Sequence, residues 1–167
     1  MKKLYLIRHA KSSWDNLNMD DFVRPLNERG KKDAPQMAKL LRQRHITPDR
    51  FITSPAVRAL TTCEEFAHVF QFDKHKIEKI NALYHASAEA WFKIIQTLKD
   101  RPADAEEIIF AFGHNPGITE FANELLNADI DNIPTCGIVS ASLKIKTWRE
   151  LTPGCGHLDS FDYPKGI

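Results

Sequence analysis

Short apolar runs of strand length alternate along this chain with longer segments in which apolar residues recur every three or four positions. The runs predict a weak strand at 76–81 and clearer strands at 3–7, 50–53, 107–112, 139–146 and 158–162. Every residue from Ile108 to Phe112 is apolar, which is typical of a strand buried on both faces. Residues 139–146 alternate instead, as in a half-buried strand, and we expect 158–162 at an edge of the sheet.

Helical spacing and end signals predict four helices between these strands. They are a helix capped by Asn27 that ends near 44, a helix over 57–70, a helix capped by Ser87 that ends near 98, and a helix that follows 113–117 and ends near 126. Gly30 and Pro35 fall inside the first helix. Because proline cannot donate a backbone hydrogen bond, we expect the first half of that helix to be kinked or irregular. The polar segment 15–22 is expected to form a turn.

The alternation of strands and helices predicts an α/β fold: a three-layer α/β/α sandwich with a mostly parallel central sheet. A chain of 167 residues fits one domain, which we place over 1–167. In folds of this kind, ligands bind beyond the carboxyl ends of the strands. The residues that follow each strand are therefore the first candidates for a functional site.

Composition and charge exclude several classes of protein. Lys and Arg number 23 against 22 Asp and Glu, so no broad nucleic-acid-binding face is expected. The three cysteines are widely spaced and form no Cys-x-x-Cys, which fits neither a disulfide framework nor a zinc knuckle. The apolar run 4–7 ends at Arg8, and no segment approaches the ~20 apolar residues of a membrane span. We therefore expect a cytoplasmic protein with no membrane partner.

Two Arg and two His residues follow predicted strands. Arg8 and His9 come after the first strand, Arg58 lies just beyond the second, and His114 follows the strand at 107–112. Arginine matches phosphate oxygens with two parallel hydrogen bonds. One histidine could attack phosphorus while a backbone carbonyl holds its other ring nitrogen, which gives a covalent phosphohistidine. The four residues thus predict phosphoryl chemistry.

The sequence motifs typical of other phosphate-binding sites and of metal sites are absent from this chain. The sequence has no P-loop and no Cys followed by Arg six positions on. No His-x-His or His-x-x-x-His occurs, so neither a metal site nor any other cofactor is expected.

Three blocks resemble the histidine phosphatase superfamily, which is also called phosphoglycerate mutase-like. They are Leu-Ile-Arg-His-Ala-Lys-Ser at 6–12, Ser-Pro-Ala-Val-Arg-Ala-Leu-Thr-Thr at 54–62 and Gly-His-Asn-Pro at 113–116. The short length, Arg-Pro-Leu-Asn-Glu-Arg-Gly at 24–30 and Leu-Tyr-His-Ala-Ser at 83–87 look most like the compact SixA-like phosphohistidine phosphatases. The resemblance implies the phosphoglycerate mutase-like form of the α/β fold.

The resemblance also implies roles for individual residues. His9 would be the nucleophile, and Arg8, Arg58 and His114 would bind and stabilise the phosphoryl group. Ser12 would lie in the loop that approaches the phosphate. Arg24 would lie at the rim of the pocket, although a solvated arginine before a proline turn is the alternative.

The chain departs from the family pattern in three places. Ala10 replaces the usual Gly after the nucleophile, and Asp15 replaces an Asn that touches phosphate in mutase-like members. His85 occupies the sequence position at which many members have the Glu that protonates the leaving group. The resemblance therefore implies that His85 lies among the substrate-binding residues. It could act as a weak acid or be a solvated histidine. These departures weaken the case for a mutase.

We therefore predict a metal-independent phosphohydrolase that forms a covalent phosphohistidine intermediate and dephosphorylates phosphohistidine on a partner protein. One alternative is a small-molecule phosphomonoesterase that acts on a sugar phosphate or nucleotide. The other is a non-catalytic module that binds phosphorylated partners, against which the presence of His9 argues, since binding alone needs no nucleophile.

Overall fold

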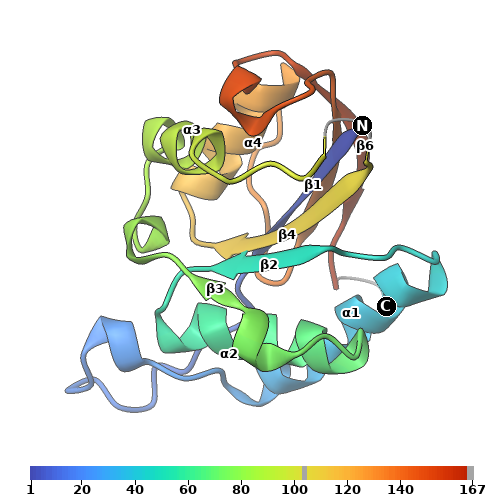
Figure 1. Cartoon of the computed structure of the whole chain (residues 1–167). Helices are drawn as coiled ribbons and strands as arrows, with labels where there is room; N and C mark the ends of the chain where they lie inside the picture. The colour runs from blue at the N-terminus through green and yellow to red at the C-terminus, as the bar shows by residue number, and fades with distance from the viewer. Residues whose placement is uncertain (103–104, 165–167) are drawn as a thin grey trace.

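The computed structural model describes residues 1–102 and 105–164, which form one six-stranded sheet with helices on both faces (Figure 1). The sheet order is β3-β2-β4-β1-β5-β6. The strands are β1 (Lys2–Arg8), β2 (Arg50–Thr53), β3 (Glu78–Lys79), β4 (Glu107–Gly113), β5 (Ile138–Leu143) and β6 (Gly156–Asp162). Among them, β6 is the edge strand that the sequence predicts.

The sheet is mixed but mostly parallel. Strands β3, β2, β4 and β1 run parallel to one another, while β5 is antiparallel to β1 and β6 is antiparallel to β5. The direction of β5 follows from the chain before it. The carbonyl of Ile133 lies near the carboxyl end of β1, where it accepts a hydrogen bond from Arg8, so β5 begins beside Ile7 and runs back.

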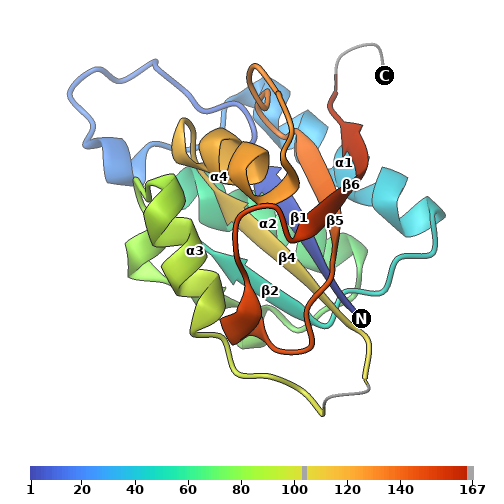
Figure 2. The ribbon, with the colours of Figure 1, turned by 90° about the horizontal axis from the view of Figure 1, so that it is seen from above.

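Helices α1 (Glu28–Gln43) and α2 (Val57–Val69) pack against each other on one face of the sheet. Helices α3 (Ala88–Gln96) and α4 (Gly117–Leu126) pack against each other on the other face, and Figure 2 shows the two helical layers from above. The three-layer α/β/α sandwich is therefore confirmed.

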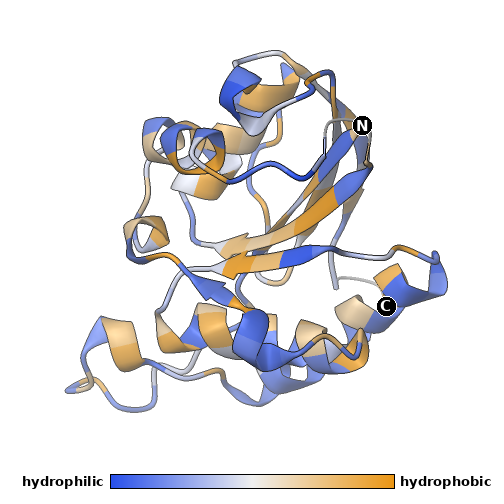
Figure 3. Cartoon of the chain, viewed as in Figure 1, coloured by the Kyte–Doolittle hydropathy of each residue, from blue (hydrophilic) through white to orange (hydrophobic). Residues whose placement is uncertain are grey.

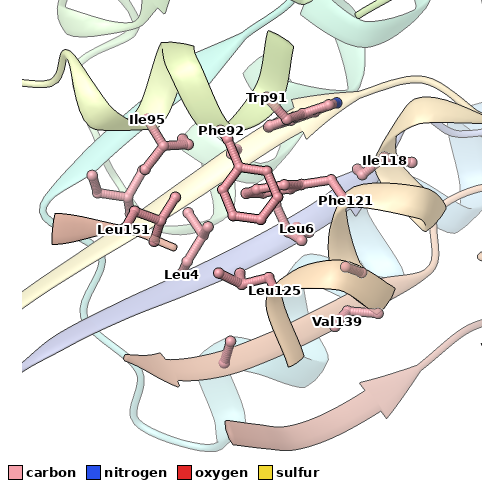
Figure 4. Close-up of a cluster of buried hydrophobic side chains, with 14 of the residues drawn as sticks. Leu4, Leu6, Trp91, Phe92, Ile95, Ile118, Phe121, Leu125, Val139 and Leu151 are labelled. Carbon is pink, nitrogen blue, oxygen red and sulfur yellow. The ribbon is translucent and has the colours of Figure 1, made fainter. Parts of the chain in front are cut away.

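Strand β1 supplies both hydrophobic cores because successive side chains of a strand point to opposite faces. Leu4 and Leu6 join the cluster beneath α3 and α4, whereas Tyr5 and Ile7 join the cluster beneath α1 and α2. Figure 4 shows the first cluster, in which Leu4 and Leu6 lie under the aromatic side chains of α3 and α4. The apolar colouring of the central strands in Figure 3 reflects burial on both faces.

The observed elements differ from the sequence prediction in several details. Helix α1 is unbroken from Glu28 to Gln43 although Pro35 lies within it, so the expected irregular first half is wrong. The Asn27 side chain caps its first turn, and its inner face is buried, which stabilises the helix despite the proline. Strand β5 ends at Leu143 and is almost wholly buried, because Val139, Ala141 and Leu143 join the cluster beneath α3 and α4 while Ile138 joins the cluster beneath α1 and α2.

The predicted weak strand at 76–81 is only the two residues of β3. In the part of the chain that the structure describes, no helix has the length and apolar character needed to cross a membrane.

Candidate active site

The carboxyl ends of β1, β2 and β4 bring the predicted site residues together. Arg8 is paired with Gly113 in the sheet, so the residues that follow, His9 and His114, lie side by side with ring centroids 5.1 Å apart. Arg58 enters from the first turn of α2, which follows β2 directly (Figure 1). Residues separated by about 100 positions thus share one site at this edge of the sheet.

His9 is buried in a defined tautomer. Its Nδ1 lies 2.8 Å from the carbonyl oxygen of Ala10, and a carbonyl can only accept a hydrogen bond. Nδ1 therefore carries the proton, and the lone pair is on Nε2. Burial lowers the pKa of His9 to about 3, and the nearby positive charges of Arg58 and Arg8 act in the same direction. His9 is therefore a neutral imidazole at physiological pH.

The backbone next to His9 is held by α2. The N–H of Ala10 donates to Thr62 Oγ1 at 3.0 Å, and the Thr62 hydroxyl donates to the carbonyl of Arg58 at 2.8 Å. The alanine at this position, where the family pattern has Gly, is fully buried and not among the residues with a positive φ.

His114 is also buried and neutral. Its Nε2 lies 2.8 Å from Ser54 Oγ, which already accepts from the N–H of Ala56 at 3.2 Å. The Ser54 hydroxyl can therefore donate its proton to Nε2 while its oxygen accepts from Ala56. On that basis Nε2 is the acceptor, and we assign the His114 proton to Nδ1. Burial, with His9 and Arg58 nearby, lowers the pKa of His114 to about 3. Within the described residues, the buried Nδ1 has no hydrogen-bond partner, so a donor remains for a substrate oxygen.

Three guanidinium groups surround the two histidines. Arg8 donates to the carbonyl of Ile133 at 2.9 Å, and its pKa is lowered by burial and by the proximity of Arg58. In the described ranges, Arg8 has no carboxylate partner, while Arg24 and Arg58 share one, Asp21. The Nε atoms of all three arginines are buried without partners among these residues. The excess of positive charge and of donors suits a phosphoryl dianion.

Ser12 and Arg24 meet because two loops pair. Ser12 forms an isolated β-bridge with Leu26, and the Arg24 guanidinium donates to Ser12 Oγ. Arg24 is buried, so the alternative of a solvated arginine is wrong. The exposed ring of Trp14 lies over its guanidinium, with 3.7 Å between the ring centroid and Cζ.

Two residues of the site were missed by the sequence analysis, Asp21 and Tyr84. The Tyr84 hydroxyl donates to Asp21 Oδ2 at 2.6 Å, and Arg58 donates to the same oxygen at 3.0 Å. Arg24 donates to Oδ1 at 2.9 Å. Partial burial opposes ionisation of Asp21, but the hydrogen bonds from Tyr84, Arg24 and Arg58 hold its pKa well below the usual range. The signal available in the sequence was the spacing of three between Asp21 and Arg24 in a segment expected to be only a turn.

His85 lies at the exposed rim. Its side chain is 62% exposed, and its Nε2 is 3.6 Å from Asp21 Oδ2. Its φ of 57° turns the chain between Tyr84 and the buried Ala86. Asp15 is exposed too, and its backbone N–H donates to Ser13 Oγ.

The sequence profile of the histidine phosphatase superfamily (branch 1) matches residues 4–91, more than half of the chain. The chain belongs to the histidine phosphatase superfamily. As a histidine phosphatase it carries the candidate residues Arg8, His9 and Arg58 within the matched segment, and His114 lies beyond it.

Two relatives resemble the chain over different lengths. An uncharacterised chloroplastic protein of Arabidopsis thaliana is 29% identical over 89% of this chain and 70% of its own length. Phosphoserine phosphatase 1 of Hydrogenobacter thermophilus is 34% identical over 51% of this chain, and the match spans only 40% of that enzyme.

Solved structures match nearly the whole chain. A protein of Agrobacterium tumefaciens assigned as phosphohistidine phosphatase SixA has a TM-score of 0.77, with 26% identity over 97% of both chains. The protein histidine phosphatase SixA in complex with tungstate also has a TM-score of 0.77, with 21% identity over 95% of both chains. The predicted fold and family are therefore both confirmed.

Proposed function

We propose that this phosphohydrolase removes the phosphoryl group from phosphohistidine on a partner protein through a covalent intermediate on His9. The observation that carries the proposal is the state of His9. It is neutral, its Nδ1 is bound to the Ala10 carbonyl, and its Nε2 lone pair lies among Arg8, Arg58 and His114. A phosphate-binding module would have no use for a nucleophile held in this way.

In the first step, Nε2 of His9 attacks phosphorus opposite the substrate nitrogen. A P–Nε2 bond forms while the bond from phosphorus to the substrate nitrogen breaks, and its electron pair stays on the substrate ring. Arg8, Arg58 and the Nδ1–H of His114 would donate to the three equatorial oxygens as charge spreads over them. The Ala10 carbonyl stabilises the positive charge that develops on the His9 ring.

In the second step, water attacks the phosphorus of phospho-His9. An O–P bond forms, the P–Nε2 bond breaks, and its electron pair returns to Nε2. Phosphate leaves with both hydrogens of the water. Neutral His9, with the proton still on Nδ1, is regenerated.

Among the rim residues that the structure describes, the carboxyl group beside the site is Asp21, and its ionised state supports a P–N rather than a P–O substrate. An alkyl ester must expel an alkoxide about as basic as hydroxide, whose parent water has a pKa of ~15.7. Asp21 is ionised and cannot supply that proton, and burial together with the bond to Asp21 raises the pKa of Tyr84. A protonated phosphohistidine leaves as neutral imidazole, whose conjugate acid has a pKa of ~6.5, and needs no such donor.

Exposed apolar side chains beside the site support a macromolecular substrate. The segment between Ser12 and Arg24 carries Trp14, Leu17, Met19 and Val23, all of them exposed. Trp14 touches the Arg24 guanidinium, so at least one of these apolar side chains lies directly beside the phosphate-binding residues. A partner protein could cover all four side chains, whereas a small phosphate ester is too small to do so.

The decisive experiment compares turnover of a phosphohistidine peptide, p-nitrophenyl phosphate, phosphoserine and a sugar phosphate. We expect phosphohistidine to be preferred, the aryl ester with its good leaving group to follow, and the alkyl phosphates to be poor substrates. His85→Ala should change phosphohistidine turnover by less than about tenfold, because the leaving ring needs no acid.

The similarity to phosphoserine phosphatase 1 supports a second candidate, a small-molecule phosphomonoesterase. Efficient hydrolysis of an alkyl phosphate that collapses in His85→Ala would favour it and would identify His85 as the general acid. Absence of any turnover, with tight binding of phosphate, would favour the binding module instead.

Metal independence is a separate prediction of the proposed mechanism. Among the described residues, no three His, Cys, Asp or Glu side chains are grouped to hold a metal ion. The arginines and His114 would carry the charge stabilisation alone, so activity should survive excess EDTA, and vanadate should inhibit competitively. Loss of activity in EDTA that added magnesium or zinc restores would contradict this mechanism.

A further inference from the structure

We propose that Asp21 is a specificity-determining residue that binds the protonated imidazole ring of a phosphohistidine substrate. The inference rests on the proposed function and extends it to the leaving group. Asp21 would hold the N–H of the ring nitrogen that does not carry phosphorus, and would thereby favour P–N over P–O bonds.

The position of Asp21 is on the side where the leaving group departs. His9 is only 7% exposed, whereas the side chains of Asp21 and His85 are 39% and 62% exposed, so Asp21 and His85 lie nearer the solvent than the nucleophile. In-line attack by His9 expels the leaving group on the side opposite to His9, and we infer that this is the solvent side, where Asp21 lies. Asp21 also contacts Arg58 and Arg24, so it lies at the border of the phosphoryl-binding groups.

The Asp21 carboxylate has an acceptor site left for a substrate. Oδ2 accepts from Tyr84 and Arg58 and lies near His85, but among the described residues Oδ1 has one bond, from Arg24. A carboxylate oxygen can accept about two hydrogen bonds. Oδ1 is therefore free to accept the N–H of a substrate ring.

A negative charge at this place has opposite effects on the two substrate classes. A phosphate ester develops negative charge on its leaving oxygen, which the carboxylate repels. A protonated phosphohistidine brings a positive ring, which the carboxylate attracts. When the P–N bond breaks, the electron pair neutralises the ring and the proton stays on its other nitrogen, so no proton needs to move.

The neighbouring side chains complete a surface for a planar ring. The rings of Tyr84 and His85 lie 4.0 Å apart between centroids, and Tyr84 stands edge-on to His114 at 5.6 Å. Tyr84 thus contacts the buried His114, which packs against His9, and its hydroxyl binds the Asp21 carboxylate at the exposed rim. An incoming imidazole could stack on them while donating to Asp21.

The test compares Asp21→Asn with the wild type on a phosphohistidine peptide and on p-nitrophenyl phosphate. We expect the ratio of kcat/KM for the peptide to that for the aryl ester to fall by about tenfold or more, the effect of losing one charge-assisted hydrogen bond. The alkaline limb of kcat for the peptide should move to lower pH, because the carboxylate no longer raises the pKa of the bound ring. Asp20→Asn, which removes the same charge from the exposed neighbouring residue, should leave the ratio unchanged.

A second measurement needs no variant. N-methylated phosphoimidazolium is a permanent cation without an N–H, so it keeps the attraction of charge but cannot donate to Asp21. The wild type should cleave it more slowly than protonated phosphoimidazole, and Asp21→Asn should reduce the difference.

The outcomes separate this inference from the proposed function. An equal fall on both substrates in Asp21→Asn would show that Asp21 only positions the arginines, and an equal rise would show that it competes with phosphate. Either result overturns the inference while the wild type remains active on phosphohistidine. A wild type inactive on phosphohistidine overturns the proposed function, and the inference with it.

Discussion

His9 owes its proposed reactivity to two features of its surroundings. Burial keeps the imidazole neutral, and the Ala10 carbonyl keeps the proton on Nδ1. A histidine on the surface would exchange between two tautomers and would titrate near pH ~6.5. In this site the attacking nitrogen is unprotonated before the substrate arrives, so no base is needed to activate it.

His9→Ala should therefore abolish turnover of every substrate, by more than the ~10²–10⁴ that is typical of losing a general acid or base. Brief exposure of the wild type to labelled substrate should leave an acid-labile, base-stable phosphate on His9. His157→Ala, which removes an exposed histidine far along the chain, is the matched control. The mechanism fails if His9→Ala keeps most of its activity or if the label is found elsewhere.

At the scale of elements, the start of α1 fixes the loop that follows β1. The N–H of Asn27 donates to the carbonyl of Lys11 at 3.0 Å, and that of Ser13 donates to Pro25 at 2.8 Å. Gly30 lies so close to this loop that an added Cβ would be 2.2 Å from the Lys11 carbonyl oxygen. The glycine inside α1 is thus needed for a close approach of two backbones.

Gly30→Ala should push α1 away from the 10–13 loop and lower the free energy of unfolding by about 1–3 kcal/mol, as overpacking in a tight interior does. The displacement of Ser12 and Arg24 should also lower kcat/KM. Chemical denaturation and turnover of p-nitrophenyl phosphate measure the two effects. Lys31→Ala, one position on and exposed, should change neither, and equal effects of both substitutions would argue against the close-approach explanation.

At the scale of the whole molecule, the apolar surface formed by Trp14, Leu17, Met19 and Val23 should act only on large substrates. A double variant Leu17→Ser/Val23→Ser should lower kcat/KM for a phosphohistidine protein by about a hundredfold, since each exposed side chain that a partner buries contributes ~1.5 kcal/mol, or about tenfold. Turnover of p-nitrophenyl phosphate should stay the same. Leu158→Ser, an exposed leucine on the edge strand β6, is the control. A parallel loss on the small substrate would assign these side chains a structural role.

Two buried neutral histidines also make the stability of the whole fold depend on pH. His9 and His114 have folded-state pKa values of about 3, against ~6.5 in an unfolded chain. Between these values the unfolded state binds more protons, so the free energy of unfolding falls as pH decreases through this range.

Urea denaturation should therefore show a lower midpoint at about pH 4.5 than at about pH 7. The variant His9→Gln/His114→Gln should show a smaller decrease, because glutamine does not titrate. His157→Gln, at an exposed position, should behave like the wild type. A decrease of the same size in all three proteins would assign it to carboxylates with lowered pKa values, such as Asp21 and Asp162.

The local pattern of the chain was enough to predict the strand–helix order and four of the residues that meet in the site. Strand and helix periods are set by neighbours within a few positions. Arg8 ends one strand, and His9 and His114 follow strands whose carboxyl ends must share one edge in a parallel sheet. The family resemblance rested instead on the residues of three blocks, at 6–12, 54–62 and 113–116.

Only the tertiary structure decided the rest. Asp21 lies in a polar segment that gives no local signal, and its importance comes from partners 37 and 63 positions away, Arg58 and Tyr84. The burial that makes His9 and His114 neutral comes from packing around them and from arginines of other elements. Likewise, the unbroken α1 and the reversed direction of β5 depend on contacts with distant segments. Hydrogen bonds, desolvation and charge act through space, so they are determined only once the chain has folded.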